Sequence, residues 1–197
     1  MDSDSTPGDG PGDPIDLADA VASIHLGDTS GADFEPPTDA DLHPALLPLS
    51  WLLGTWRGHG RGSYPTVEEF AYGHEVSFSH RGKPLLEYVS RSWSLDDSRP
   101  LAAETGYLRP QPGGEVEAVI AHGSGIAEVS YGTVQGVKLE LASDFMARTA
   151  TATEVSGLHR LYGLLEGVLL YAIDMSAMGQ PLQPHLWGRL YRSRQSS

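Results

Sequence analysis

The stretch that decides the fold is EVEAVIAHGSGIAEVSYGTVQGVKLELASD, residues 115–144. Apolar side chains recur at every second position from Val116 to Ile120, and again from Val137 to Leu141. A period of two is typical of a β-strand that buries one face. The glycine-containing segments HGSG and VQG separate the runs at hairpin-length intervals. The stretch therefore predicts three consecutive antiparallel strands.

The same rhythm continues on both sides of this stretch. Runs rich in Val, Thr, Tyr, Phe and Trp are separated by the turn signals HRGK, DDSR, QPGG, LEG and GQP. The expected strands are 54–61, 67–79, 84–94, 101–109, 115–122, 125–133, 137–144, 155–164, 167–176 and 184–193. About ten short sequential strands favour an all-β, antiparallel up-and-down barrel over the competing β-sandwich, because closure removes exposed edges. A barrel of this size can hold one small ligand.

Two different segments precede the strands. Residues 1–41 contain eleven Asp or Glu and no Lys or Arg, whereas the rest of the chain has a formal charge of only −2. This Pro/Gly/Asp-rich composition predicts a disordered acidic arm, because it has little to bury. The segment HPALLPLSWLLG then predicts a short helix or 3₁₀ turn whose leucines pack on the barrel mouth. We therefore expect one barrel domain over residues 42–197.

Composition limits the classes of protein to which the chain can belong. The chain has no cysteine, which excludes a disulfide framework and a thiolate ligand and fits a reducing compartment. A net charge of −13 disfavours nucleic acid and anionic lipid as partners. The N-terminus lacks a secretory-signal pattern, and the longest apolar stretch, Leu46–Leu53, is too short to span a membrane. We expect a cytoplasmic protein with no nucleic-acid or membrane partner.

The first candidate motif is GTWRGHG, residues 54–60, which places Gly54, Gly58 and Gly60 on the first strand. Glycine inside a strand marks a bend or a close approach of backbone. We interpret the glycines as providing strand curvature or room beside a planar ligand. Trp56 is predicted to be structural and to plug one end of the barrel, with a partner for its indole N–H.

Spacing alone does not select a metal-binding histidine. The eight histidines are residues 25, 43, 59, 74, 80, 122, 159 and 185. None forms the i, i+4 pair of an HExxH zinc site. His80 and His122 fall in turn signals and are expected to be exposed, whereas His59 and His74 lie on strands and can face either side. Alternation assigns His185 to neither face, which a bulge or a place at the barrel rim would explain.

The order of motifs resembles that of the nitrobindin family, a group of lipocalin-like, fatty-acid-binding-protein-like β-barrels that bind haem. The motifs are GTWRGHGRGSYPT at 54–66, GKP at 82–84, ETGYLR at 104–109 and GQPLQPHL at 179–186. They run through essentially the whole barrel domain in order, and the acidic arm lies outside them.

This resemblance implies one haem b per subunit, with His185 as the axial ligand of the iron and Thr66 as a second haem contact. A turn-forming role after Pro65 is the alternative for Thr66. The resemblance also implies a peroxynitrite isomerase that forms nitrate, binds nitric oxide and protects against reactive nitrogen species. A homodimer is left open. Neutral imidazole is a standard axial ligand of haem iron.

One departure from the family pattern concerns Glu154, in TATEVSG, where many members carry a haem-contacting Lys. A carboxylate there would repel a haem propionate, and Arg148 and Arg160 are the cations available to offset it. This departure keeps open the alternative that the chain is a non-catalytic carrier of a small hydrophobic ligand.

Overall fold

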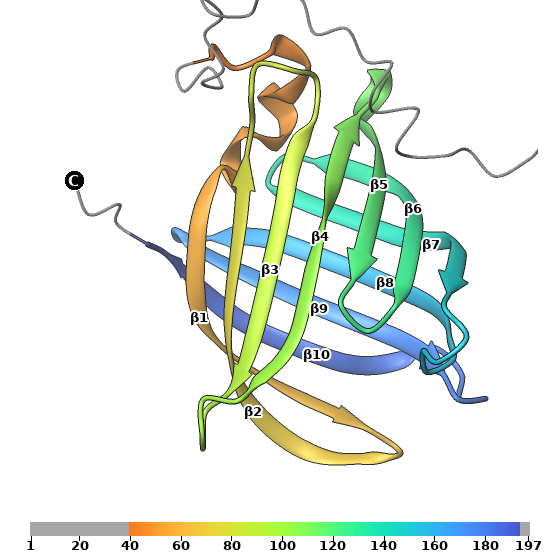
Figure 1. Ribbon diagram of the computed structural model, residues 1–197. Helices are drawn as coiled ribbons and strands as arrows, with labels where there is room; N and C mark the ends of the chain where they lie inside the picture. Colours follow the sequence, from red (N-terminus) through yellow and green to blue (C-terminus); the bar gives the residue numbers. More distant parts are fainter. Residues whose placement is uncertain (1–39, 194–197) are drawn as a thin grey trace, which may run out of the picture. The chain divides into compact units, whose positions relative to one another are not determined.

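The computed structural model describes residues 40–193, and the predicted acidic arm, residues 1–41, lies almost wholly outside them. The described residues form a barrel of ten strands preceded by the 3₁₀ helix η1, Pro44–Leu52 (Figure 1). A short 3₁₀ turn, η2 (Pro112–Gly114), precedes β5. The strands are β1 (Gly54–Tyr64), β2 (Val67–Ser79), β3 (Leu86–Ser94), β4 (Pro100–Pro110), β5 (Glu115–His122), β6 (Ile126–Gln135), β7 (Lys138–Arg148), β8 (Val155–Leu165), β9 (Val168–Ala177) and β10 (Gln183–Arg192).

Each strand pairs antiparallel with its neighbours in sequence, and β1 pairs with β10 to close the sheet. The predicted up-and-down barrel is therefore confirmed, and the sandwich alternative is wrong. All ten expected strands are present, with small differences at their ends. The largest is at β7, which continues to Arg148 because an irregular register leaves Asp144 without a partner on β6. Such a bulge shifts the side-chain alternation that sequence reading depends on.

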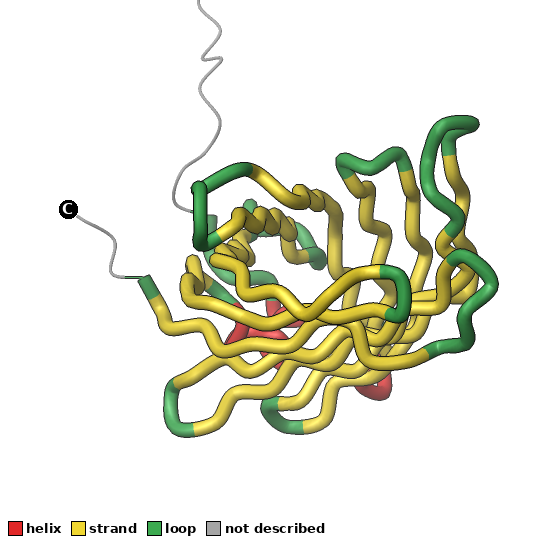
Figure 2. Tube along the Cα trace, turned by 90° about the horizontal axis from the view of Figure 1, so that it is seen from below, coloured by secondary structure: helices red, strands yellow, loops and turns green. Residues whose placement is uncertain are grey.

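The helix η1 closes one end of the barrel. Its Leu46, Leu49 and Leu52 are completely buried, as the sequence predicts. Trp56 is also buried, and its indole nitrogen donates to the carbonyl of Leu52 at 2.7 Å. The structural role expected for Trp56 is thus confirmed. Figure 2 views the barrel from below, with η1 behind the strands.

The side chains inside the barrel become more polar with distance from η1. Along β2, Phe78 lies at the η1 end, where it pairs with Gly54, and the inward positions then run through Val76 to His74 and Tyr72. Beyond the apolar layer, the barrel encloses polar side chains. The buried polar and charged residues are His74, Ser90, Glu128, Ser130 and Arg160. Among residues 40–193, no helix is both long enough and apolar enough to cross a membrane.

Candidate functional site

Strand irregularities meet at the rim opposite η1. The register of β1 against β2 shifts between Gly62 and Tyr64, and that of β10 against β9 shifts between Pro184 and Leu186. His185 is therefore the extra residue of a β-bulge. A bulge turns a side chain away from the direction that alternation would give it. The bulge that the sequence suggested at this position is confirmed.

The ring of His185 is held by contacts with β1. Its Nδ1 lies 3.1 Å from the carbonyl oxygen of Ser63. Because a carbonyl only accepts, Nδ1 carries the proton, and Nε2 keeps its lone pair. The ring also meets Tyr64 edge-on, with centroids 5.4 Å apart. Tyr64 is itself fixed, since its hydroxyl accepts from the backbone nitrogen of Ala177 at 2.8 Å.

Electrostatics keep His185 neutral. The side chain is half-buried, and burial lowers its pKa although the hydrogen bond to Ser63 acts in the opposite direction. A neutral imidazole with a fixed tautomer is the form that binds a metal through its second nitrogen. Nε2 makes no hydrogen bond to another described residue. The arrangement can therefore supply one axial nitrogen ligand at the barrel rim.

The glycines of the GTWRGHG motif lie where strand packing is tight. Gly54 has a φ of 109°, a left-handed conformation that side chains disfavour. A Cβ on Gly60 would lie 2.5 Å from the hydroxyl of Tyr171 and 2.6 Å from the carbonyl oxygen of Trp187. A Cβ on Gly58 would meet the backbone of β10 even more closely. The geometry therefore shows close approach of neighbouring chain at Gly58 and Gly60. Strand curvature and room beside a planar ligand, the two roles expected for these glycines, stay predictions.

The other residues singled out in the sequence are distributed around the same end of the barrel. Thr66 is exposed in the turn that joins β1 to β2. Glu154 is exposed just before β8, and its carbonyl accepts from the backbone nitrogen of Met178. Arg148 is exposed and donates to the carbonyl of Ala152 at 3.2 Å. Arg160 is buried inside the barrel, so the suggestion that it offsets the charge of Glu154 is wrong.

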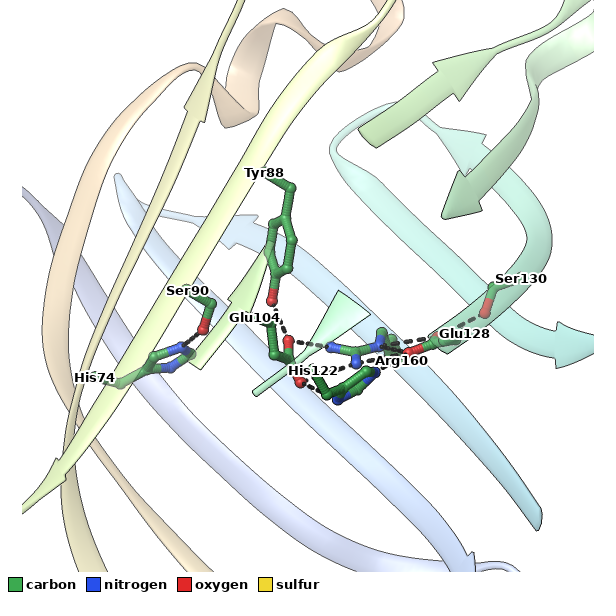
Figure 3. A network of polar contacts seen from close by, with 8 residues as sticks. All are labelled: His74, Tyr88, Ser90, Glu104, His122, Glu128, Ser130 and Arg160. Atoms are coloured by element: carbon green, nitrogen blue, oxygen red, sulfur yellow. Dashed lines mark hydrogen bonds and ion pairs between the residues drawn. The ribbon is translucent and has the colours of Figure 1, made fainter. Parts of the chain in front are cut away.

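Arg160 instead joins two carboxylates inside the barrel (Figure 3). Its Nη1 and Nη2 each donate to Glu104 at 3.0 Å, and its Nη2 donates to Glu128 at 2.7 Å. Bidentate contacts of this kind are the strong form of an Arg–carboxylate pair. Tyr88 donates to Glu104 at 2.6 Å, and Ser130 donates to Glu128 at 2.5 Å.

His122 completes this buried cluster. Its two ring nitrogens lie 3.2 Å from Glu104 and 3.1 Å from Glu128. Burial disfavours the charged ring, but the hydrogen bonds to both carboxylates raise the pKa of His122 to about 9. Burial likewise opposes the charge of Glu128, yet the Arg160 guanidinium lowers the pKa of Glu128 to about 2. At neutral pH, two negative and two positive groups therefore balance.

The expectation that His122 is exposed is wrong, since only 11% of its side chain is accessible. A signal was present in the sequence: His122 continues the alternation that places Val116, Ala118 and Ile120 inside. His80 is half-buried, and His59 and His74 face outward and inward respectively. Sequence reasoning also missed Glu104, Glu128 and Arg160, because charged residues in a strand are ordinarily placed on the solvent face.

Two cavities lie next to the buried cluster. A groove of about 770 Å³ reaches Glu104 and His122 from outside but does not include His185. A small interior void of about 30 Å³ is lined by Glu104 and His74, and also by Leu186, the neighbour of His185. Groove and void share Ser92, Ala102 and Glu104. The groove is thus the larger space, whereas the void is the one adjoining the histidine-bearing strand.

Residues 45–192 match the model of the family described as THAP4-like, heme-binding beta-barrel domain, and the chain belongs to this family. Haem is therefore the cofactor that family membership supports. A "Peroxynitrite isomerase" of Nocardioides sp. is 52% identical over 163 residues, which cover 81% of this chain and 98% of the relative. A protein of the same name from Parafrankia sp. is 49% identical over 174 residues, 78% of this chain and 82% of the relative.

A solved structure is similar as well. Rv2717c from M. tuberculosis superposes with a TM-score of 0.73 at 46% sequence identity, covering 78% of this chain and all of that chain.

Proposed function

We propose that this chain is a haem b protein that isomerises peroxynitrite to nitrate, with His185 as the axial ligand. The observation that carries the proposal is the fixed, neutral imidazole of His185, whose Nδ1 bonds to Ser63 while its Nε2 has no hydrogen-bond partner within residues 40–193. The names of relatives about 50% identical to the chain support the reaction. Two carboxylates, an arginine and a histidine are engaged with one another elsewhere in the barrel and are not needed for this ligand role.

The residues at the rim fit a haem in their donor chemistry. The chain contains no cysteine, so imidazole, methionine and tyrosine are the axial donors it can offer, and His185 provides an oriented imidazole. The hydrogen bond from Nδ1 to a backbone carbonyl fixes the tautomer and orients Nε2, as is usual for histidines that bind metals. Leu186, next to His185 on β10, is only partly buried and supplies apolar surface for a porphyrin edge. The site therefore combines one oriented nitrogen ligand with an apolar wall.

Each residue has a limited task in the proposed reaction. When bound, ferric haem supplies a Lewis-acidic iron that polarises the peroxynitrite oxygen. Ser63 keeps the proton on Nδ1, so that His185 binds as a neutral ligand. Tyr64 holds the ring from the side and restricts its rotation. No proton has to be gained or lost overall, because peroxynitrite and nitrate are isomers, so the proposal requires no general acid from the protein.

The carrier alternative is disfavoured by the filling of the barrel. A lipid-like ligand needs a large apolar cavity, with pockets for ordinary ligands measuring about 300–1,000 Å³. The interior void measures only about 30 Å³, and both polar and apolar side chains line it. Aliphatic, aromatic and charged side chains fill the remaining interior. The groove of about 770 Å³ is open on the outer face and reaches the charged groups of Glu104 and His122, so it is not the enclosed apolar cavity that a lipid-like ligand needs.

Hemin titration of His185→Ala tests the ligand assignment. The wild-type protein should develop a Soret band, and the alanine variant should lose it. His59→Ala is a matched control, because His59 is exposed on the outer face of β1 and should leave the band unchanged. Equal hemin binding by wild type and His185→Ala would show that another group ligates the iron.

The reaction is tested separately by stopped-flow measurement of peroxynitrite decay together with the yield of nitrate. The haem-loaded protein should speed decay and raise the nitrate yield, and the haem-free protein should do neither. A decay rate equal to that in buffer would rule out the isomerase while leaving haem binding intact. Thr66→Val should weaken hemin binding if the Thr66 hydroxyl contacts the haem; unchanged affinity would assign Thr66 to the turn alone.

Nitric oxide binding, protection against reactive nitrogen species and a cytoplasmic location belong to the same proposal. Nitric oxide should shift the visible spectrum of the haem-loaded protein, and a static spectrum would contradict binding. Protection predicts that cells lacking the protein become more sensitive to peroxynitrite and regain resistance with wild type but not with His185→Ala. Fractionation of those cells should recover the protein with cytoplasmic markers.

A homodimer is supported by exposed apolar side chains on adjacent strands. Tyr107 pairs with Val119, Val119 pairs with Val129, and Val129 pairs with Phe145, so these side chains form one row across the outer face of β4 to β7. Three of them are exposed although large and apolar. Light scattering should give a dimer mass for wild type and a monomer mass for Phe145→Lys. A monomeric wild type would contradict the proposed dimer.

A further inference from the structure

The interior void contains an unsatisfied polar atom. His74 is only 6% exposed, and its Nε2 lies 2.9 Å from the hydroxyl of Ser90 (Figure 3). Its Nδ1 is the one buried side-chain nitrogen or oxygen in residues 40–193 that has no hydrogen-bond partner. Buried polar groups without a partner are rare, and each calls for a physical explanation. His74 lines the void, so a partner for Nδ1 can be sought there.

The protonation state of His74 defines whether a partner of Nδ1 must donate or accept a hydrogen bond. Burial lowers the pKa of His74 to about 4, with smaller and opposing influences from Glu104 and Arg160. The ring is therefore neutral near pH 7, and one nitrogen donates while the other accepts. Ser90 can match either nitrogen role at Nε2, since a hydroxyl both donates and accepts. A partner of Nδ1 must likewise be able both to donate and to accept a hydrogen bond.

A pair of tyrosine hydroxyls with one hydroxyl proton not used between them lines the same void. The hydroxyls of Tyr72 and Tyr171 lie 2.6 Å apart and bond to each other. Two hydroxyls carry two protons, but the contact between them uses only one. Neither hydroxyl bonds to a further group in the described part of the chain. The rings lie beside His74, with centroids 4.7 Å away for Tyr171 and 6.0 Å away for Tyr72.

We propose that this void is a binding site for one water molecule, which bridges His74 Nδ1 and the free hydroxyl proton of the Tyr72–Tyr171 pair. The void of about 30 Å³ exceeds the roughly 10–15 Å³ of probe volume that a water needs. A purely apolar void would remain dry, but this one offers at least two polar partners with unmet needs. Water accepts the tyrosine proton and matches either tautomer of His74.

The void lies against the outer groove. The void and the outer groove share Ser92, Ala102 and Glu104, so the two spaces adjoin at these residues. Glu104 does not compete for the water as a charged, unpaired group, because Arg160, His122 and Tyr88 already bond to it. The site thus lies between a balanced ionic cluster and the wall of β10, where Leu186 separates it from the His185 rim.

A high-resolution crystal structure of the haem-loaded wild-type protein tests the proposal directly. We expect solvent density within hydrogen-bond distance of His74 Nδ1 and of a hydroxyl of Tyr72 or Tyr171. Neutron diffraction from the same crystals should show the tyrosine deuteron pointing at that solvent. An empty void, a direct bond from His74 Nδ1 to a tyrosine, or solvent bonded to neither group would overturn the proposal.

Two variants sharpen this result. His74→Phe removes the nitrogen and fills part of the void, so the density should disappear, whereas His59→Phe on the outer face should leave it in place. Density that persists unchanged in His74→Phe would mean that His74 does not hold the water. The wild-type diffraction maps remain decisive if His74→Phe fails to fold.

Discussion

Arg160→Met tests the energetic role of the buried cluster. Arg160 is 1% exposed and contacts both Glu104 and Glu128, of which Glu128 is completely buried. Methionine keeps an unbranched apolar stem but leaves the two carboxylates without their main cation. Removing one partner of a buried ion pair typically costs about 3–5 kcal/mol, because the other charge stays buried. Since whole domains are stable by only about 5–15 kcal/mol, the variant should lose a large share of its free energy of unfolding.

The dependence of this loss on pH follows from the carboxylate pKa values. Burial raises them, but the Arg160 charge holds the pKa of Glu104 well below its usual range and lowers that of Glu128 to about 2. A depressed carboxyl pKa stabilises the fold above the unfolded value of 4.5, and that stability is lost as pH falls toward 2. For Glu128 alone this amounts to about 3 kcal/mol, at about 1.36 kcal/mol per pKa unit. Arg160→Met lacks this contribution, so the difference in free energy of unfolding between wild type and variant should be largest near neutral pH and should become smaller in acid.

Urea unfolding of both proteins across a pH series measures the difference. Arg109→Met is the matched control, because Arg109 pairs with Glu117 at 2.8 Å on the outer face and its side chain is 53% exposed. An exposed ion pair of this kind contributes no more than about 1 kcal/mol to the free energy of unfolding. If Arg160→Met costs no more than Arg109→Met at neutral pH, or if its deficit does not change with pH, the reasoning about the cluster is wrong.

The remaining predictions concern close packing, titration and the arm. Gly60→Ala should lower stability in urea by about 1–3 kcal/mol, because its Cβ meets the backbone of Trp187, which cannot yield. Gly163→Ala should cost much less, because its Cβ would lie 3.9 Å from the carbonyl oxygen of Val137, an ordinary contact distance. The pKa of His74 is lowered to about 4, so the free energy of unfolding of the protein should fall as pH falls from 6.5 toward 4. An NMR titration of His74 with a midpoint near 6.5 would contradict this. Deleting residues 1–40 should leave the thermal midpoint nearly unchanged; a large drop would show that the arm packs on the barrel.

Strand positions could be predicted closely where alternation is undisturbed. The expected strands 67–79 and 115–122 coincide with β2 and β5. The prediction ended β7 at 144, four residues early, because the bulge at Asp144 interrupts the period of two. Local side-chain patterns report which face a residue occupies only while the register of hydrogen bonds is regular.

The buried cluster could not be predicted from local patterns. Glu104, Glu128 and Arg160 come from three strands far apart in the sequence, and each looks like a solvent-facing charge by itself. Only the closure of the barrel brings β4, β6 and β8 around one interior and lets the charges neutralise one another. Alternation did carry partial information, since Glu128 follows Ile126 by two positions and Arg160 follows Leu158 by two. A charge in register with buried neighbours indicates a buried partner, which sequence alone does not identify.

His185 illustrates how a break in pattern can itself locate a site. Proline inside a sheet is confined to edges, strand starts and bulges, because it cannot donate to the ladder. A closed barrel has no edges, so Pro184, one residue inside β10, marks the place where regular pairing stops. The register shift follows at His185, and the neighbouring shift at Ser63 provides the carbonyl that holds the ring. Once the barrel is inferred, a proline followed by a histidine near the start of a strand points to a re-aimed side chain at the rim. The closure of the barrel and the chemistry of Pro184 thus point to His185, the histidine that family resemblance selects.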